Sequence, residues 1–183
     1  RCHTPTYTET RSMTWQSIVA GANGIVFYEY TDLLRNPDVP FETSFANLKQ
    51  IAAEVMQQAP IILSDAGKAP SPAVMGHLSS PRGSWLMTRA QWSDDQDRIY
   101  VLFAVSDGDG EGLVKFDLSK RSAFGCTSEL SVLRVMEPDP RAGNKAAPPV
   151  VTGCTFTDTV PLMAAVAYNI SFKSDDGQAS KRQ

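Results

Sequence analysis

The feature that most constrains this chain is a strand-like run, IVFYEY at residues 25–30, between two amphipathic helical segments. Both faces of the run carry apolar side chains, which is typical of a parallel strand covered by helices. A helix–strand–helix order is the repeat of an α/β barrel or of a doubly wound sheet. The chain offers one run of this kind, so we expect the neighbouring strands to come from another polypeptide or from a longer form of the protein.

The helix before this run is predicted by its capping signals. Thr6 and Glu9 have the spacing of a capping box, which places the start of a helix near Tyr7. The turn GANG at residues 21–24 should end it, and its Asn or its second Gly suits the left-handed position after a helix. Its apolar stripe, which we expect to face a core, consists of Trp15, Ile18, Val19 and Ala22.

A second helix is predicted over residues 42–58, after a loop that contains two prolines. Pro60 should stop this helix, because proline lacks the N–H that a helix interior needs. The helix has apolar residues three and four positions apart, and we expect them to form its buried face. These residues are Phe45, Leu48, Ala52, Val55 and Ala59, with Ile51 and Met56 beside them.

The remainder of the chain has a different pattern. Residues 64–74, SDAGKAPSPAV, have the composition of a linker. Over residues 75–172 the apolar period is two, and short β-prone runs alternate with turn signals, which predicts an antiparallel β-sandwich. Residues 173–183 are polar and are expected to form a disordered tail.

Composition and motifs argue against several classes of function. The net charge is −3 and is spread evenly, so we expect no nucleic-acid partner. No run approaches the roughly 18 apolar residues of a membrane span. The chain has no P-loop, no dinucleotide fingerprint and no G-x-S-x-G motif, and we expect no cofactor. His3 and His77 are far from any cysteine pair with ligand spacing, so we also expect no metal.

The three cysteines and one sequon bear on the cellular compartment. Cys126 and Cys154 lie beside glycines at strand-like edges, so a disulfide between them is one interpretation, with Cys2 left to pair outside the chain. Three buried thiols in a reducing compartment are the alternative. Asn169 begins a glycosylation sequon, which fits a secreted or lysosomal protein. The N-terminal sequence RCHTP is typical of a processed or excised end.

Three stretches carry a resemblance to a known family. Residues 11–25 (RSMTWQSIVAGANGI) resemble the last barrel helix and the turn that feeds the eighth strand of β-galactosidase-like glycoside hydrolases with a TIM barrel. Residues 41–63 resemble the closing eighth helix. TFTDTVP at 155–161, followed by VAYNI at 166–170, resembles the last two strands of a β-sandwich appended to that barrel.

The resemblance extends over most of the chain and implies a fold. Residues 1–63 would be the last strand and helices of a (β/α)8 barrel, and residues 75–172 a small antiparallel β-sandwich packed against them. The partner would be the remaining barrel of the same protein, as a separate or missing chain.

The resemblance also implies a function. The chain would be the C-terminal fragment of a carbohydrate-active protein, a glycoside hydrolase, and would line its sugar cleft. The catalytic carboxylates of such enzymes follow the fourth and seventh strands, so this chain alone should be inactive. The alternative is a carbohydrate-binding or structural surface protein that lacks catalytic carboxylates and uses the sandwich for interactions.

Candidate substrate-binding residues follow from the predicted strand. Glu29 lies near its C-terminal end, on the face where TIM-barrel active sites are built, and could accept hydrogen bonds from sugar hydroxyls. Tyr28, Tyr30 and Asp32 extend the same rim, where an aromatic ring could stack on a sugar. The alternatives are a structural ion pair for Glu29 and aromatic packing for the tyrosines. We also expect an exposed apolar surface on residues 13–63 that requires a partner.

Overall fold

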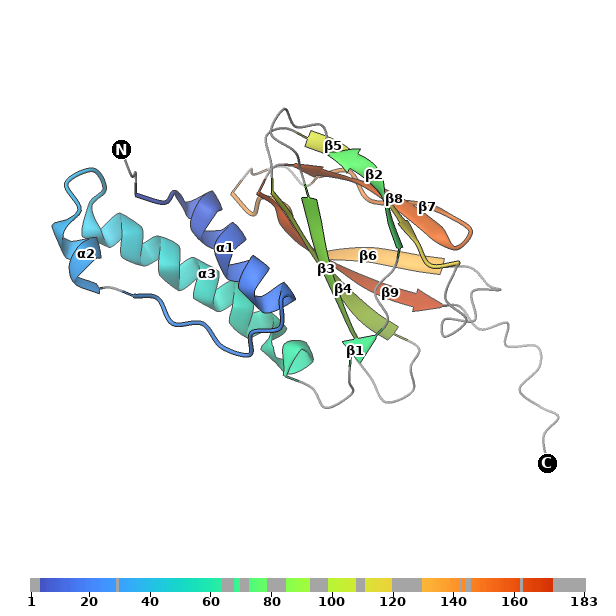
Figure 1. The fold of residues 1–183 in the computed structure, drawn as a ribbon, viewed down its shortest axis with the longest axis horizontal. Helices are drawn as coiled ribbons and strands as arrows, with labels where there is room; N and C mark the ends of the chain where they lie inside the picture. The colour runs from blue at the N-terminus through green and yellow to red at the C-terminus, as the bar shows by residue number, and fades with distance from the viewer. Residues whose placement is uncertain are drawn as a thin grey trace.

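The computed structural model describes residues 4–28, 30–63, 68–69, 73–78, 85–92, 99–107, 111–119, 130–141, 143, 146–161 and 163–172. Helices come first, as α1 (Tyr7–Val19), α2 (Tyr30–Arg35) and α3 (Phe41–Ile62), and strands β1 to β9 follow. Figure 1 shows the helices on one side of the molecule and the strands on the other. Of the predicted linker, Lys68–Ala69 forms β1 and Ala73 begins β2, whereas the predicted tail lies outside the described residues beyond Phe172.

The strands form two antiparallel sheets. One has the order β1 (Lys68–Ala69), β3 (Trp85–Trp92), β4 (Ile99–Asp107), β9 (Ala165–Phe172), β6 (Leu130–Met136). The other has the order β2 (Ala73–Leu78), β5 (Glu111–Asp117), β8 (Thr155–Pro161), β7 (Val150–Thr152). The period-two alternation of the sequence predicted antiparallel strands of this kind.

Alternation along β9 separates two hydrophobic cores. Val166, Tyr168 and Ile170 belong to a core between the two sheets, together with Phe116 of β5 and Phe156 of β8. Ala165 and Ala167 point to the opposite face, where they join a second core with the helices. Successive residues of a strand face opposite sides, so one central strand serves both cores. The result is three layers: helices, a five-stranded sheet and a four-stranded sheet.

The prediction that residues 1–63 form the last strand and helices of a barrel is wrong. Residues 25–28 are neither helix nor strand, and α2 begins at Tyr30, where the strand was expected to end. No backbone hydrogen bond joins residues 25–28 to any other described segment. A strand exists only through its neighbours, because its N–H and C=O groups need partners outside the segment. The described strands all lie in the two antiparallel sheets, so this run stays without a sheet.

The start of α1 was predicted correctly, and the turn at residues 21–24 follows its end as expected, but the left-handed residue within that turn was not predicted correctly. The backbone N–H of Thr6 donates to the Glu9 carboxylate at 2.7 Å, and the N–H of Glu9 donates to Oγ1 of Thr6 at 3.2 Å. This is the predicted capping box. The left-handed residue is Gly21, with φ of 114°, rather than Asn23 or Gly24. The chain therefore leaves the helix at the first residue of the GANG turn rather than at its third or fourth.

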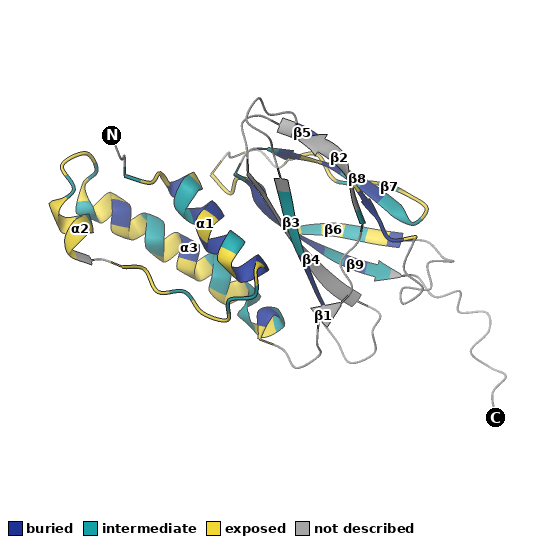
Figure 2. Ribbon diagram, viewed as in Figure 1, coloured by how far each residue is buried: buried dark blue, intermediate teal, exposed yellow. Residues whose placement is uncertain are grey.

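Helix α3 differs from its prediction in length and in rotation. It continues past Pro60 to Ile62, and the N–H of Leu63 still donates to the carbonyl of Ala59 at 2.9 Å. Its buried residues are Ser44, Ile51 and Ile62, seven or eleven positions apart. Phe45 is 40% exposed and Met56 is 70% exposed, although both belong to the expected buried stripe. Figure 2 shows exposed residues recurring along α3 and along the trace between α1 and α2.

Two buried arginines fix the helices to the strands. Arg11 of α1 pairs with Glu54 of α3 at 3.0 Å and donates to the carbonyls of Glu137, Pro138 and Ala165 at 2.8–3.0 Å. Arg89 of β3 donates to the carbonyl of Ile18 at 2.9 Å and to that of Ile62 at 3.2 Å. These are the last turns of α1 and α3, where helix dipoles favour a cation.

Candidate functional site

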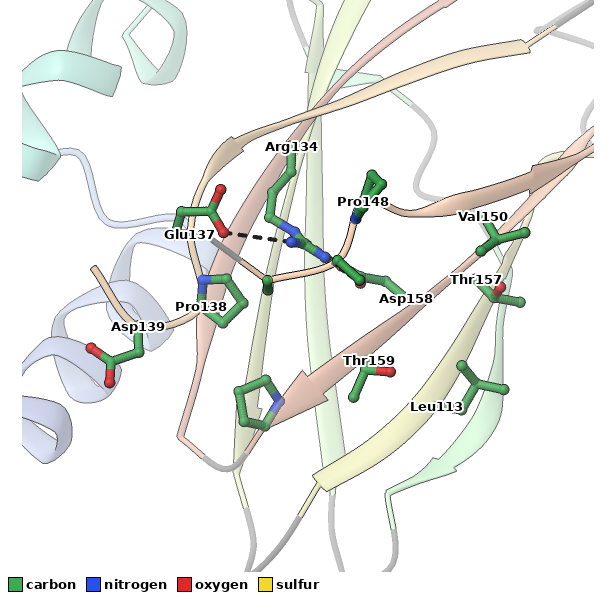
Figure 3. A pocket seen from close by; sticks show the side chains of 13 residues that line it. Leu113, Arg134, Glu137, Pro138, Asp139, Pro148, Val150, Thr157, Asp158 and Thr159 are labelled. Carbon is green, nitrogen blue, oxygen red and sulfur yellow. Dashed lines mark hydrogen bonds and ion pairs between the residues drawn. The ribbon is translucent and has the colours of Figure 1, made fainter. Parts of the chain in front are cut away.

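The candidate site is a pocket of about 400 Å³ beside the free part of β8. Strand β7 pairs with β8 only through Thr155–Thr157, whereas β8 continues to Pro161. The segment from Glu137 to Pro148, which leads from β6 towards β7, supplies several residues of the pocket wall. Figure 3 shows residues of β5, β6, β7 and β8 converging on this space. The pocket therefore arises where a short edge strand leaves its neighbour uncovered.

A buried ion pair forms the inner wall of the pocket. Arg134 of β6 and Asp158 of β8 have side chains that are nearly inaccessible to solvent. The guanidinium donates through Nε to Oδ2 of Asp158 at 3.2 Å and through a terminal nitrogen to Oδ1. The hydroxyl of Tyr168 donates to Oδ2 of Asp158 at 2.5 Å. Because β6 and β9 belong to one sheet and β8 to the other, this network joins the sheets.

Two members of the network, Tyr168 and Arg134, have raised pKa values. Burial raises the pKa of the Tyr168 phenol strongly, and the neighbouring charge of Asp158 raises it further. Burial by itself would lower the pKa of Arg134, but its hydrogen bond to Asp158 and the charge of that carboxylate outweigh this, and the pKa is raised. Tyr168 therefore stays a neutral donor, and Arg134 stays a cation.

The outer part of the pocket combines polar and apolar groups. Glu137 is turned towards Arg134, with 3.5 Å between its Oε2 and an Arg134 terminal nitrogen, whereas Asp139 points away from that arginine (Figure 3). Thr157 and Thr159 line the pocket from the outer face of β8. Their cross-strand partners Val150 and Leu113 supply the apolar surface.

This arrangement is suited to binding rather than to proton transfer. Asp158 accepts hydrogen bonds from Tyr168 and, through both oxygens, from Arg134. A carboxylate held in this way is a poor general base, since a base needs a free lone pair directed at the substrate. Glu137 and the two threonines line the open space.

The predicted rim residues do not gather at this pocket. Tyr28 belongs to the run without a sheet and is 89% exposed, and Asp32 is an exposed residue of α2. Tyr30 is the first residue of α2, and Glu29 lies outside the described residues. The alternation that placed these residues on one rim depended on a strand that is not formed. Their role in sugar binding stays a prediction.

The remaining candidate sites are partly described. Cys154, between β7 and β8, is disulfide-bonded, while the other two cysteines lie outside the described residues, so the pairing with Cys126 stays a prediction. Asn169 is partly buried in β9, with Val101 and Leu133 as its strand neighbours. Within the described ranges, no group of three or more His, Cys, Asp or Glu is placed to hold a metal ion. None of the described helices combines the length and apolar character of a membrane span.

Sequence reasoning missed Arg134, Glu137 and the two threonines. Asp158 and Tyr168 did belong to the two sequence stretches 155–161 and 166–170 that carried the family resemblance, and the structure brings them into hydrogen-bond contact. Arg134 lies 24 residues before Asp158. An arginine in the middle of an apolar strand, followed some way on by an aspartate in another, was the signal available.

Comparison with known proteins gives no relative for this chain. No protein-family model, no curated protein and no solved structure matches it.

Proposed function

We propose that this chain is a non-catalytic part of a carbohydrate-active protein, a secreted or lysosomal glycoside hydrolase. In this proposal, the helical layer docks on the part of the protein that carries the catalytic carboxylates. The observation that carries the proposal is the exposed apolar run at residues 26–28. Val26 is 90% exposed and Tyr28 is 89% exposed, and both lie in a run that makes no backbone hydrogen bond to another described segment.

Other side chains of the helical layer support a docking surface. Burying one large apolar side chain contributes about 1.5–3 kcal/mol, so several such side chains in water are a substantial unused driving force. Monomeric proteins rarely expose contiguous apolar patches of more than a few hundred Å². The large apolar residues of this layer that are exposed, besides Val26 and Tyr28, are Met13, Phe27, Leu34, Phe45, Met56 and Leu63.

The carbohydrate class rests on the resemblance of residues 11–25, 41–63, 155–161 and 166–170 to β-galactosidase-like hydrolases. Glycoside hydrolysis requires two carboxylates, about 5–5.5 Å apart for retention or about 6.5–9.5 Å apart for inversion. In the pocket, Glu137 and Asp158 both contact Arg134, so they do not form a free acid and base. This supports the expectation that the chain alone is inactive.

Two measurements test the proposal. The isolated chain should not hydrolyse a panel of chromogenic aryl glycosides, whereas the protein purified from its native source should hydrolyse at least one of them. Intact-mass analysis of that native protein should reveal a longer chain or a tightly bound companion. Turnover by the isolated chain would refute the proposal, as would a native protein that is an inactive monomer of 19.9 kDa.

A pair of variants tests the docking surface itself. The double variant Val26→Asp with Tyr28→Asp, made in the native protein, should weaken the docking of the helical layer on the catalytic part of the protein. The reason is that two carboxylates would enter an apolar interface. Leu133→Asp is the control, since Leu133 is an apolar residue on β6 of the sandwich that is 64% exposed. Equal effects of the two changes on glycosidase activity and thermal stability would argue against docking through residues 25–28.

A further inference from the structure

We infer that the pocket beside β8 binds a neutral sugar ring. This site is separate from the predicted rim at Tyr28 and Asp32, and nothing in the inference depends on how the helical layer docks. Its volume of about 400 Å³ lies within the range of small-molecule pockets, about 300–1,000 Å³.

The polar side of the pocket offers a donor and an acceptor next to each other. A terminal nitrogen of Arg134 contacts Oε2 of Glu137 at 3.5 Å, which is the outer limit of a hydrogen bond. That nitrogen carries two N–H groups, so it can donate further. Glu137 is partly exposed and has a second oxygen free to accept. Two neighbouring hydroxyls of a sugar could accept from Arg134 and donate to Glu137 in a single pose.

The outer face of the four-stranded sheet supplies the complementary surface. Thr159 is paired across the strands with Leu113 of β5, and Thr157 with Val150 of β7. Directly paired residues share one face of a sheet, so two hydroxyls lie between two aliphatic side chains. Leu113 is 61% exposed and Val150 is 64% exposed, and both line the pocket. A sugar ring has the matching chemistry, with an apolar C–H face and hydroxyls around its edge.

The charges of the pocket select against ionic ligands. Arg134 is already paired with Asp158, so a phosphate or carboxylate ligand would also meet Glu137, a second negative group. An ammonium group at hydrogen-bond distance from Glu137 would lie beside the Arg134 guanidinium, and two like charges within a few Å repel. A neutral ligand with several hydroxyls satisfies both Glu137 and Arg134 without either penalty.

Titration of the isolated chain by two-dimensional NMR tests the inference. D-galactose and D-glucose serve as neutral probes, with inorganic phosphate and lysine methyl ester as anionic and cationic probes. We expect saturable shifts with at least one sugar, located on residues 113, 134–139, 150 and 157–161. No saturable sugar binding, or binding of an ionic probe in place of a sugar, would overturn the inference.

Three variants assign the contacts. Thr159→Val removes a hydroxyl without changing the shape of an exposed side chain, and Glu137→Gln removes the charge and one acceptor. Each should weaken sugar binding about threefold to tenfold, the usual value of one hydrogen bond. Thr152→Val is the matched control, because Thr152 is an exposed threonine at the end of β7 that does not line the pocket.

The outcome of these variants is independent of the docking proposal. Sugar affinity unchanged in both Thr159→Val and Glu137→Gln would overturn the pocket assignment, whatever the activity of the native protein. Unchanged affinity in Val26→Asp with Tyr28→Asp is expected, because those residues are not part of the pocket. A loss of sugar binding in that variant, with binding intact in the pocket variants, would also overturn the assignment.

Discussion

Asp158 is a buried carboxylate that receives hydrogen bonds from two strands of the opposite sheet. Taking a carboxylate and a guanidinium out of water costs several kcal/mol each, and good geometry only offsets this cost. The contribution of such a pair is therefore to fix one arrangement of β6, β8 and β9 rather than to add much stability. The same arrangement forms the inner wall of the pocket.

The phenol of Tyr168 gives this network a measurable signature at high pH. Its pKa is raised in the folded state, so its contribution to stability is complete below about pH 10, the unfolded value, and is lost as pH rises above it. In that range the free energy of unfolding should fall by up to about 1.4 kcal/mol per pH unit. Urea unfolding between pH 8 and 11.5 measures this slope.

The variant Tyr168→Phe should flatten the alkaline slope. It should also lower stability at neutral pH by about 1.5–3 kcal/mol, the usual range for a hydrogen bond to a charged group. The pKa of Tyr7 is raised as well, by burial and then by Glu54, so part of the slope should remain. An unchanged slope in the variant would show that Tyr168 ionises normally in the folded protein.

Helix α3 shows how an element can be predicted while its orientation is not. Its apolar spacing indicated a helix, but the expected buried face was too broad: it contained Ile51, which is buried, together with Phe45 and Met56, which are exposed. The face that packs is the one containing Ser44 and Ile51. Which apolar residues of α3 face inward depends on the shape of the sheet that the helix packs against, and the spacing of apolar residues in the sequence does not contain that shape.

The rotation of α3 can be tested by comparing two substitutions. Ile51→Ala should destabilise the isolated chain by about 2–5 kcal/mol, because Ile51 is fully buried and a cavity would remain. Met56→Gln should change stability by no more than about 0.5 kcal/mol, since Met56 is mostly in water. Chemical denaturation of both variants measures the difference. Equal costs would mean that Met56 is buried like Ile51, as expected from the sequence, and would contradict the rotation of α3 described above.

Elements set by local chemistry were predictable, and those that need distant partners were less so. The capping box of Thr6 and Glu9 acts within one turn, and its prediction is confirmed. The prediction of a strand at residues 25–30 was wrong, because β-propensity alone forms no strand without neighbouring strands. The pocket requires Arg134 and Asp158, which lie on different sheets, to be in contact. No pattern among neighbouring residues predicts a contact of this kind.

At the scale of the whole molecule, the helices and the sheets are joined through a shared core and through buried cations. The indole of Trp15 stacks on the ring of Phe103 with 5.5 Å between centroids, and its N–H donates to Glu54. Arg11 and Arg89 add hydrogen bonds to backbone carbonyls on both sides of the contact. We therefore expect helices and strands to unfold in one transition.

The variant Arg11→Met tests this coupling. It leaves Glu54, whose side chain is only 14% exposed, without its cation and should destabilise the chain by about 3 kcal/mol. Thermal unfolding followed by far-ultraviolet and near-ultraviolet circular dichroism should give coincident curves for the wild type. Arg35→Met is the control, because Arg35 is exposed at the end of α2. Separate transitions in the wild type would show that the layers fold independently.

The run at residues 25–28 has a consequence for the chain when it is alone in solution. A β-prone segment whose N–H and C=O groups have no backbone partner among the described residues can pair with the same segment of a second copy, and stacking of many copies is the route to amyloid. In the proposed docking, the part of the protein that covers Val26 and Tyr28 would then also prevent fibril formation. The chain would depend on meeting that cover soon after synthesis.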